Sequence, residues 1–392
     1  MEKSEPRLEA PSSLLRQAVD TGGIPAASSC VFHQGKVLHL YAFGDPSQGD
    51  TTPDSLFDIA SITKVVATTT SAAVMVARGA LDLDRPVREI LEDCPLPDSV
   101  TSRTLLSHTS GLEAWRPLFQ HVQTDPVASA LYDSEPADPG LWARARRLIL
   151  NAAQAPKLKN DACVYSDLGF IVLGEVIETI GKASLDAVVT ELVLQPLQLH
   201  NTRYVCLPVQ EASVLAKTRH VLPTGTHRPR PPAPGQENLF EPGTGSEENR
   251  AEVDDDNAWA MGGVAAHAGL FSTAHDVARW GSLVLEEIQG ANQLGAGEVL
   301  RNWMTRTETG RGLGFDFAQG QGSTAGPRWG QHSDSGGPGH LGFTGCSIWI
   351  DRDREISGAL LTNRVLPGRE SVKPIGQLRP AFYESVLESI ER

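Results

Sequence analysis

The stretch FDIASITKVVATTTSAAVMVARG, which runs from Phe57 to Gly79, consists almost entirely of small and apolar residues. This composition predicts a buried helix that begins near Ser61 and ends at Gly79. Lys64 is a charged residue inside this stretch, and it follows Ser61 by three positions. Residues three apart share one face of a helix, so the Ser61 hydroxyl and the Lys64 ammonium group can meet.

This spacing is compatible with nucleophilic catalysis. A serine hydroxyl becomes a nucleophile when a base lies within hydrogen-bond distance. Lysine can be that base if its pKa falls from about 10.4 towards neutrality, and burial lowers the pKa of a lysine. The neighbours Ala60, Val65 and Ala67 are compatible with such a buried site. An alternative interpretation is structural, because a Ser-x-x-Lys sequence arises by chance and can lie on a solvated stripe of a helix.

The composition limits the class of protein and its partners. The chain has 392 residues, of which 40% are hydrophobic and 21% are charged, as is typical of a globular protein. The net charge of −14 opposes binding to nucleic acid or to an anionic membrane surface. No apolar run approaches the roughly 20 residues that cross a bilayer, so no membrane span is expected.

The N-terminal segment and the cysteines bear on the compartment. The segment MEKSEPRLEAPSSLLRQAVD carries early acidic residues and lacks the apolar core of a signal peptide. The five cysteines are widely spaced without a Cys-x-x-Cys pair, which argues against a disulfide framework or a zinc site. These features predict a cytoplasmic protein, or a periplasmic or secreted one if a signal peptide has been removed.

Strands are predicted at both ends of the chain, with helices between them. The stretch ASSCVFHQGKVLHLYAFG indicates a hairpin that turns at Gln34-Gly35, and GFTGCSIWID and EISGALLTNR indicate two further strands near the C-terminus. This order predicts an α+β fold in which an antiparallel sheet, flanked by helices, carries an inserted and mainly helical lobe.

We expect a single two-lobed domain over residues 1–392. The α/β lobe would comprise about 1–75 and 260–392, and the helical lobe about 76–259, including a Pro/Gly-rich loop at 224–248. The crevice between the lobes is the expected place for a site.

Two later motifs contain residues that could take part in catalysis. CVYSDLGF places Tyr165, Ser166 and Asp167 directly before a predicted helix, and Ser166 or Asp167 could equally serve as an N-cap. GGPGHLGFTG places His340 and Gly342 where a Gly-rich loop enters a predicted strand, and it could equally be an ordinary turn. Each motif alone therefore supports two interpretations.

Taken in order, the motifs at Ser61–Lys64, Tyr165–Asp167 and His340–Gly342 resemble those of the serine β-lactamase and penicillin-binding protein superfamily. The resemblance is closest to its class C-like branch, which includes esterases and peptidases. The stretches LLSHTSGL from Leu105 and GGVAAHAGLFSTAHDVARW from Gly262 support it. It implies a β-lactamase/transpeptidase-like fold and a serine hydrolase without a cofactor.

The resemblance also implies catalytic roles. Ser61 would attack a carbonyl and form an acyl-enzyme, and Lys64, alone or with Tyr165, would accept its proton. Tyr165 beside two cations would ionise more easily than usual. Asp167 stands where the family usually has Asn, and it could hydrogen-bond Lys64 or the substrate. As a carboxylate it would favour charged Lys64, which opposes the role of base.

The substrate-binding residues follow in the same way. The Ser61 and Phe343 N–H groups would form an oxyanion hole, with Phe343 on a strand, and Gly342 would let the backbone approach the ligand. His340 stands where penicillin-recognising members carry Lys. Because histidine is mostly neutral at pH 7, ester, amide or peptide hydrolysis is expected over β-lactam hydrolysis. The acids at 254–256 suggest a solvated turn, and no metal is expected.

The substrate remains open between a small ester and an amide. VDDDNAWAMGGVAAHAG resembles the HDENA-like segment of a subgroup that includes muropeptide amidases, although Asp254 occupies the usual His position. We predict an enzyme of the carboxylesterase or cell-wall peptide amidase type. The alternatives are a true β-lactamase or D-alanyl-D-alanine carboxypeptidase, and a sensor or binding module that does not turn over. His108 and His267 are expected to be structural, with His108 holding a loop near the cleft.

Overall fold

The computed structural model describes most of the chain. The described residues are 8–45, 50–132, 138–155, 163–209, 215, 220–224, 251–318, 322–331 and 336–391. Apart from Thr224, the Pro/Gly-rich loop predicted at 224–248 lies outside the described residues.

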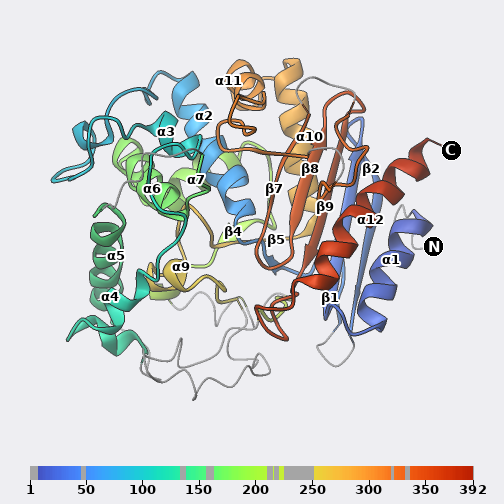
Figure 1. Cartoon of the computed structure of the whole chain (residues 1–392), viewed down its shortest axis with the longest axis horizontal. Coiled ribbons are helices and arrows are strands. Elements are labelled where there is room, and N and C mark those ends of the chain that lie inside the picture. The colour runs from blue at the N-terminus through green and yellow to red at the C-terminus, as the bar shows by residue number, and fades with distance from the viewer. Residues whose placement is uncertain are drawn as a thin grey trace.

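A six-stranded antiparallel sheet takes its strands from both ends of the chain, as predicted (Figure 1). The strand order is β2-β1-β9-β8-β7-β6, and Cys30 of β1 pairs with Ala359 of β9 at the centre. The hairpin between β1 and β2 turns at Gln34 and Gly35, whose φ values of 51° and 74° suit a two-residue turn. The strands are β1 (Ala26–His33), β2 (Lys36–Gly44), β6 (Asp316–Ala318), β7 (Gly337–Leu341), β8 (Ser347–Asp351) and β9 (Ile356–Thr362).

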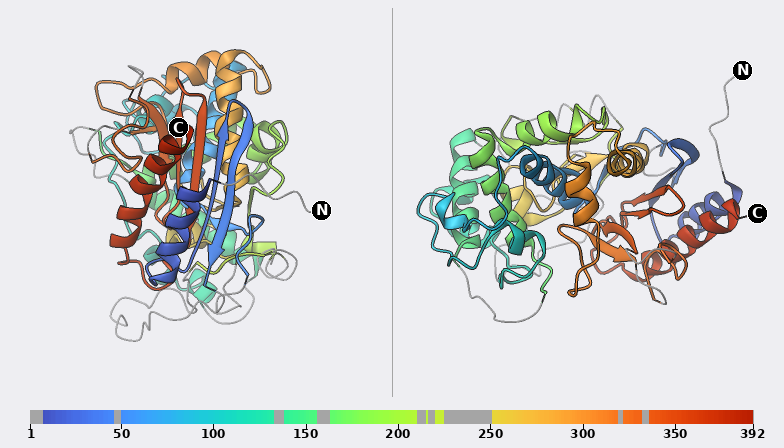
Figure 2. Two further views of the ribbon diagram at one scale, coloured as in Figure 1. Left: turned by 90° about the vertical axis from the view of Figure 1, so that its right-hand side faces the viewer. Right: turned by 90° about the horizontal axis from the view of Figure 1, so that it is seen from above.

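Helices cover both faces of this sheet. The terminal helices α1 (Glu9–Asp20) and α12 (Lys373–Ile390) pack together against one face, and α10 (Ala274–Gln289) packs against the other (Figures 1 and 2). Thr273 caps α10, because its side chain accepts a hydrogen bond from the Asp276 N–H, as the sequence predicts. The side chains under α1 and α12 form one apolar cluster, and those on the α10 side form a larger one that continues among the remaining helices.

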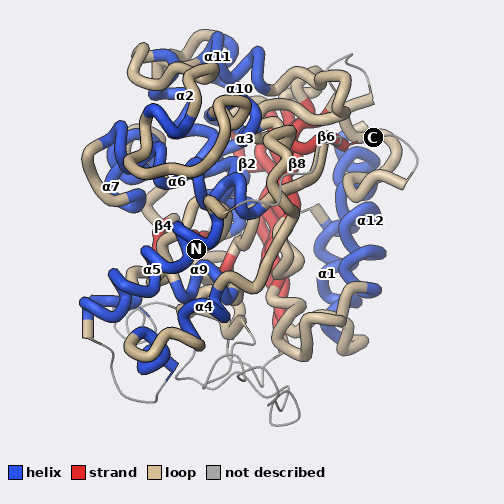
Figure 3. The backbone as a smooth tube through the Cα atoms, turned by 60° about the vertical axis from the view of Figure 1, so that its left-hand side comes forward, coloured by secondary structure: helices blue, strands red, loops and turns tan. Residues whose placement is uncertain are grey.

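The helical part of the fold lies beside the sheet (Figure 3). A smaller sheet, with strand order β3-β5-β4, is paired antiparallel throughout. Its strands are β3 (Phe57–Asp58), β4 (Arg203–Tyr204) and β5 (Leu270–Ser272). The other helices are α2 (Thr70–Ala77), α3 (Ser102–Leu106), α4 (Phe119–Gln123), α5 (Pro139–Ala153), α6 (Asp167–Gly181), α7 (Leu185–Val189), α9 (Asp256–Ala260) and α11 (Gly297–Trp303). The observed architecture is the predicted α+β fold, while the lobe boundaries stay a prediction.

The helix predicted from Ser61 to Gly79 is present. Ser61 lies in a turn, helical hydrogen bonding begins at the next residue, and α2 ends at Ala77. The segment Lys64–Thr69 is a π-helix, a wide turn that often occurs at functional sites.

The strand predicted over 342–351 is shorter than expected. β7 ends at Leu341, a tight turn follows at 342–346, and β8 begins at Ser347. The Gly342 N–H donates to the Cys346 carbonyl at 2.7 Å, and Gly345 has a φ of 101° that favours glycine. The second glycine of GFTG therefore closes a hairpin turn where the sequence interpretation continued a strand.

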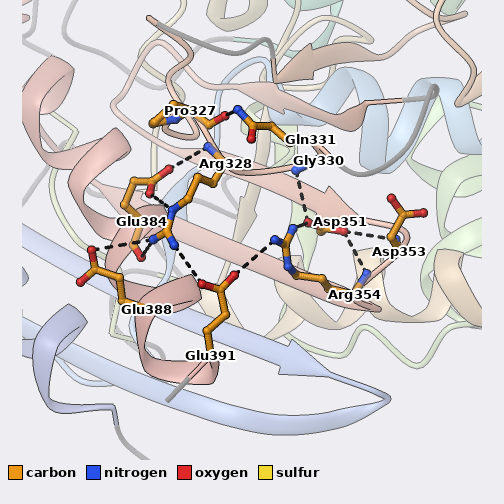
Figure 4. Close-up of polar contacts among 10 residues, drawn as sticks. All are labelled: Pro327, Arg328, Gly330, Gln331, Asp351, Asp353, Arg354, Glu384, Glu388 and Glu391. Atoms are coloured by element: carbon orange, nitrogen blue, oxygen red, sulfur yellow. Dashed lines mark hydrogen bonds and ion pairs between the residues drawn. The ribbon is translucent and has the colours of Figure 1, made fainter.

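Ion pairs anchor the C-terminal end of α12 to the sheet (Figure 4). Arg328 contacts Glu384 at 2.6 Å and Glu391 at 2.9 Å, and Arg354 contacts Asp351 at 2.8 Å and Glu391 at 3.3 Å. The same helix reaches the candidate site at its other end.

Two further observations concern the described residues alone. No helix among them combines the length and the apolar character that a membrane crossing requires. All five cysteines belong to the described ranges, and none of them forms a disulfide.

Candidate active site

A strained turn carries Ser61. Ala60, the residue before it, has a φ of 47°, a left-handed conformation that is uncommon for a residue with a side chain. Asp58, the last residue of β3, holds this turn because its Oδ1 accepts the Ala60 N–H at 2.8 Å. Its Oδ2 accepts the Asp254 N–H at 2.7 Å, and burial raises the pKa of Asp58 to about 7. Ser61 is thereby presented at the start of a helical segment, just before Ile62, whose N–H donates to the Ile59 carbonyl at 3.1 Å.

Lys64 is fully buried and meets three groups. Its Nζ lies 3.0 Å from the Ser61 Oγ, 2.9 Å from the His267 carbonyl oxygen and 2.6 Å from an Asp167 carboxylate oxygen. The spacing of the sequence therefore does bring hydroxyl and amine together. The alternative of a solvated stripe is wrong, since Lys64, Thr68 and Ser71 are all buried.

The charge state of Lys64 differs from the expectation. Burial lowers the pKa of Lys64, but the Asp167 carboxylate and the Tyr165 phenol outweigh burial, and the pKa lies above its ordinary value. The predicted fall of the lysine pKa is thus wrong for the structure as it stands. Lys64 is an ammonium ion in this structure. As expected from the sequence, the Asp167 carboxylate contacts Lys64 and favours its charged form, which opposes the role of Lys64 as a base.

Tyr165 joins the same cluster. Its phenol interacts with both Ser61 and Lys64, and the Lys64 Nζ lies 5.0 Å from the centre of its ring. Burial raises the pKa of Tyr165, and Asp167 adds to the rise, so the interactions with Lys64 and Ser61 do not compensate. The expectation of an easily ionised tyrosine is therefore wrong for the resting site.

His108 holds the loop that carries Tyr165 and Asp167. The Ser166 N–H donates to the His108 Nδ1 at 3.0 Å, and the Val164 N–H donates to the His108 carbonyl at 2.9 Å. The His108 ring also lies against the Tyr165 ring, with 4.8 Å between centres. Burial lowers the pKa of His108 well below its ordinary value, so the ring is neutral and can accept. The predicted role of this histidine as a loop anchor is confirmed.

His340 lies in strand β7 and is buried beside Tyr165. Its Nδ1 donates to the Leu341 carbonyl at 2.7 Å, and its ring centre lies 5.7 Å from that of Tyr165. Burial, together with the Lys64 charge, lowers the pKa of His340 to about 3. The ring is neutral at pH 7, and its buried Nε2 has no hydrogen-bond partner among the described residues. His340 therefore supplies no fixed positive charge.

The turn after β7 approaches the nucleophile turn closely. A Cβ on Gly342 would lie 2.6 Å from the Ile59 carbonyl oxygen, so the position requires glycine. Phe343 follows, in the turn rather than on a strand, and the residue is 52% exposed. Within the described part of the chain, neither the Ser61 N–H nor the Phe343 N–H donates a backbone hydrogen bond. Both residues line one cavity.

That cavity has a volume of about 720 Å³, within the range of small-molecule sites. The residues predicted for the site meet in it: Ser61, Tyr165, Asp167, His340, Gly342 and Phe343 line its wall, and Lys64 lies behind Ser61. Exposed apolar side chains also line it, namely those of Trp115, Phe343 and Val372.

The acids at 254–256 also line the cavity, with protein partners. Arg369 contacts Asp254 at 3.3 Å and Asp256 at 2.7 Å, and His267 contacts Asp255 at 2.9 Å. They are thus not the solvated turn that the sequence suggested. In the described ranges, no three His, Cys, Asp or Glu side chains are grouped in a way that could hold a metal ion.

Among the residues of the cavity wall that the sequence interpretation missed are Trp115, Arg311 and Arg379. No motif marks Trp115 or Arg311. The Arg311 guanidinium lies 5.3 Å from the centre of the Tyr165 ring and 3.7 Å from Asp316. A signal did exist for Arg379, because its helical position places a charge beside the apolar residues Leu378 and Phe382.

Comparison with known proteins defines the class. The sequence profile of the Beta-lactamase family matches residues 12–379. The chain therefore belongs to the Beta-lactamase family, and the hydrolase names of its relatives agree that it is a serine hydrolase.

The similar proteins differ in their named activities. N-acetylmuramyl-L-alanine amidase of Bacillus subtilis (strain 168) is 26% identical, over 87% of this chain and 78% of its own. A protein of Escherichia coli O157:H7 with the provisional name D-alanyl-D-alanine carboxypeptidase is 24% identical, over 97% of this chain and 86% of its own. The structure of D-amino acid amidase from Ochrobactrum anthropi SV3 superposes with a TM-score of 0.67 at 19% identity and covers 97% of this chain and 98% of its own. This structural likeness shows the shared fold.

Proposed function

We propose that the chain hydrolyses small amides, and esters as well, through an acyl-enzyme on Ser61. The contact among the Ser61 hydroxyl, the Lys64 ammonium and the Tyr165 phenol carries the proposal. Tyr165 comes from a segment far along the chain from Ser61 and Lys64. Ser61 and Tyr165 line one cavity that is large enough for a small substrate, and Lys64 lies behind Ser61.

The protonation states of Lys64 and Tyr165 determine which form of the enzyme is active. At neutral pH the site holds protonated Lys64 and protonated Tyr165, because both pKa values are raised. This pair must lose one proton before it can accept that of Ser61. Activity therefore rises with pH as the pair deprotonates.

In the acylation step, the Ser61 Oγ bonds to the substrate carbonyl carbon while its proton passes to the Tyr165–Lys64 pair. The carbonyl oxygen becomes an oxyanion, which accepts hydrogen bonds from the N–H groups of Ser61 and Phe343. The pair then gives its proton to the leaving nitrogen, and the carbon–nitrogen bond breaks. Water attacks the acyl ester, passes a proton to the same pair, and Ser61 leaves with that proton restored.

The site meets a requirement of amide hydrolysis, which needs a proton donor for the leaving nitrogen. An amine leaves only when its nitrogen is protonated, whereas many alcohols leave more readily. The buried Lys64–Tyr165 pair beside the Ser61 Oγ is a proton source at the required place. The names of the similar amidases from Bacillus subtilis and Ochrobactrum anthropi support this choice.

The cavity favours a substrate that is uncharged beside His340. A neutral, buried imidazole does not attract a carboxylate as a lysine would. At the mouth, Trp115, Phe343 and Val372 offer apolar contact. We therefore propose amides of small amino acids or short peptides, with an apolar group at this mouth.

A panel of amides tests the proposal. Purified full-length chain is given p-nitroanilides of D- and L-amino acids, p-nitrophenyl esters, a chromogenic cephalosporin, and peptides with a free C-terminal carboxylate. We expect turnover of anilides and esters, little of the cephalosporin, and none of any substrate by Ser61→Ala. Turnover in Ser61→Ala equal to that of the unmodified chain would refute the assignment.

One result would redirect the choice of substrate. Arg311 is the cation of the cavity wall that lies over the Tyr165 ring. If only peptides with a free carboxylate are cleaved, and Arg311→Met loses that activity, the enzyme is a carboxypeptidase that uses Arg311 in place of a charged residue at His340.

A further inference from the structure

Arg379 of α12 reaches from the C-terminal helix into the wall of the candidate site. Its side chain is buried, with the residue 8% exposed, and it lines the same cavity as Ser61. The helix that carries it covers the face of the sheet opposite to α10 and contributes no residue of the three motifs.

The guanidinium of Arg379 donates hydrogen bonds to the turn that follows β7. One nitrogen, Nη2, donates to the Gly342 carbonyl at 2.8 Å and to the Cys346 carbonyl at 2.7 Å. These carbonyls stand at the two ends of the turn, and Phe343 lies between them. The same turn makes a second contact, in which the Thr344 hydroxyl donates to the Asp58 carbonyl at 2.7 Å.

The bond to Gly342 has a chemical consequence. The Gly342 carbonyl and the Phe343 N–H belong to one peptide group, so a cation at the oxygen draws electron density from the nitrogen at the other end. Hydrogen bonds polarise one another in this way, and bonds from a charged donor are the stronger ones. The Phe343 N–H therefore becomes a better donor towards a negatively charged oxygen.

We propose that Arg379 is a positioning residue of the oxyanion hole, which orients and polarises the 342–343 peptide group so that its N–H stabilises the tetrahedral intermediate. This inference rests on the proposed function, because it takes the Phe343 N–H as an oxyanion donor. Arg379 acts through the peptide group, and its own contacts are with the protein backbone.

The burial of Arg379 supports a role beyond holding the turn. Burial lowers the pKa of Arg379 to about 10. Its titratable neighbours are the Cys346 thiol and the Tyr383 phenol, whose pKa values burial raises, and the like-charged Arg364. Burying a cation without a carboxylate beside it is unfavourable, and such groups concentrate at functional sites. A neutral amide side chain could donate to the same carbonyls at a lower desolvation penalty, but it would polarise the peptide group less.

Two substitutions separate charge from structure. Arg379→Gln keeps a hydrogen-bond donor and removes the charge, and Arg379→Lys keeps the charge and loses the planar fork. Arg328→Gln is the matched control, because Arg328 also anchors α12, through Glu384 and Glu391 at its other end (Figure 4). Each variant is titrated with a fluorophosphonate, so that rates are expressed per functional site.

We expect kcat per titrated site to fall about 10- to 100-fold in Arg379→Gln. Removal of a whole oxyanion donor costs at least as much. The KM should change less than threefold. The affinity for phenylboronic acid, whose tetrahedral adduct places an oxygen in the hole, should fall in proportion. Arg379→Lys should retain part of both, and Arg328→Gln should keep kcat per site within twofold even if its melting temperature falls.

The results distinguish this inference from the function on which it rests. If the unmodified chain hydrolyses amides and is labelled at Ser61, but Arg379→Gln and Arg379→Lys keep kcat per site and boronate affinity within twofold, Arg379 only holds the turn and the inference is overturned. If the unmodified chain is neither active nor labelled, the proposed function fails, and the inference fails with it.

Discussion

Substitution of Asp167 by Asn should make the enzyme active at lower pH. The Asp167 carboxylate lies 2.6 Å from the Lys64 Nζ, and it raises the pKa of both Lys64 and Tyr165. The pair must lose a proton to accept that of Ser61, so a raised pKa places the rise of kcat/KM at higher pH. An uncharged amide at position 167 no longer raises either pKa, so the pKa of Lys64 and the pKa of Tyr165 both fall. The acidic limb of the pH–rate profile therefore moves to lower pH.

The size of the change follows from the contact. A carboxylate within contact distance of an ammonium ion changes its acid dissociation constant by about 10- to 1000-fold. The separation of 2.6 Å favours a large effect, whereas the 17% exposure of the Asp167 side chain lets solvent screen it. We expect the lower part of that range. On the acidic limb, kcat/KM as a fraction of its plateau should rise about 10- to 100-fold.

The assay is the pH dependence of kcat/KM between pH 5 and pH 10 for one p-nitroanilide substrate, normalised to the plateau of each variant. Asp316→Asn is the matched control, because Asp316 is another carboxylate of the cavity wall and its ion-pair partner is Arg311. Its acidic limb should coincide with that of the unmodified chain. An acidic limb of Asp167→Asn that stays in place, or moves to higher pH, would refute the reasoning on Lys64.

Three further substitutions have defined outcomes. Gly342→Ala places a Cβ 2.6 Å from the Ile59 carbonyl oxygen, so kcat/KM should fall by about 100-fold or more while the far-UV circular dichroism is unchanged; a loss below threefold would contradict the close approach. His340→Lys introduces a permanent cation, and the ratio of kcat/KM for carboxylate-bearing to neutral substrates should rise about tenfold; an unchanged ratio would show that no substrate group meets this position. Because the pKa of buried Asp58 is raised to about 7, the stability that protonated Asp58 provides is lost as the pH rises from about 4 to about 7. In urea unfolding, the unmodified chain should lose about 4 kcal/mol relative to Asp58→Asn between pH 4 and pH 8, and a constant difference would exclude this titration.

The sequence was sufficient for the contacts that depend on local spacing. Ser61 and Lys64 meet because they are three apart at the start of a helix, and the sheet joins both termini because strong strand patterns flank the helices. The order of the three motifs placed Tyr165 and His340 at the same cavity.

The charge state of the site could not be predicted in the same way. The spacing predicts that Lys64 can meet Ser61, but the sign of the Lys64 pKa shift depends on whether Asp167 lies 2.6 Å away or points to solvent. Burial and ion pairing oppose each other here, and only the three-dimensional arrangement decides which is larger. The turn after β7 was missed for a related reason, because Gly345 can continue a strand or close a hairpin.

Labelling of the full-length chain by a fluorophosphonate, followed by intact-mass measurement and peptide mapping, tests the central claim most directly. The account predicts one adduct on Ser61, none in Ser61→Ala, and a labelling rate in Lys64→Ala that is lower by about 100-fold or more. An adduct on another residue, or equal labelling of the Ser61→Ala chain, would contradict it.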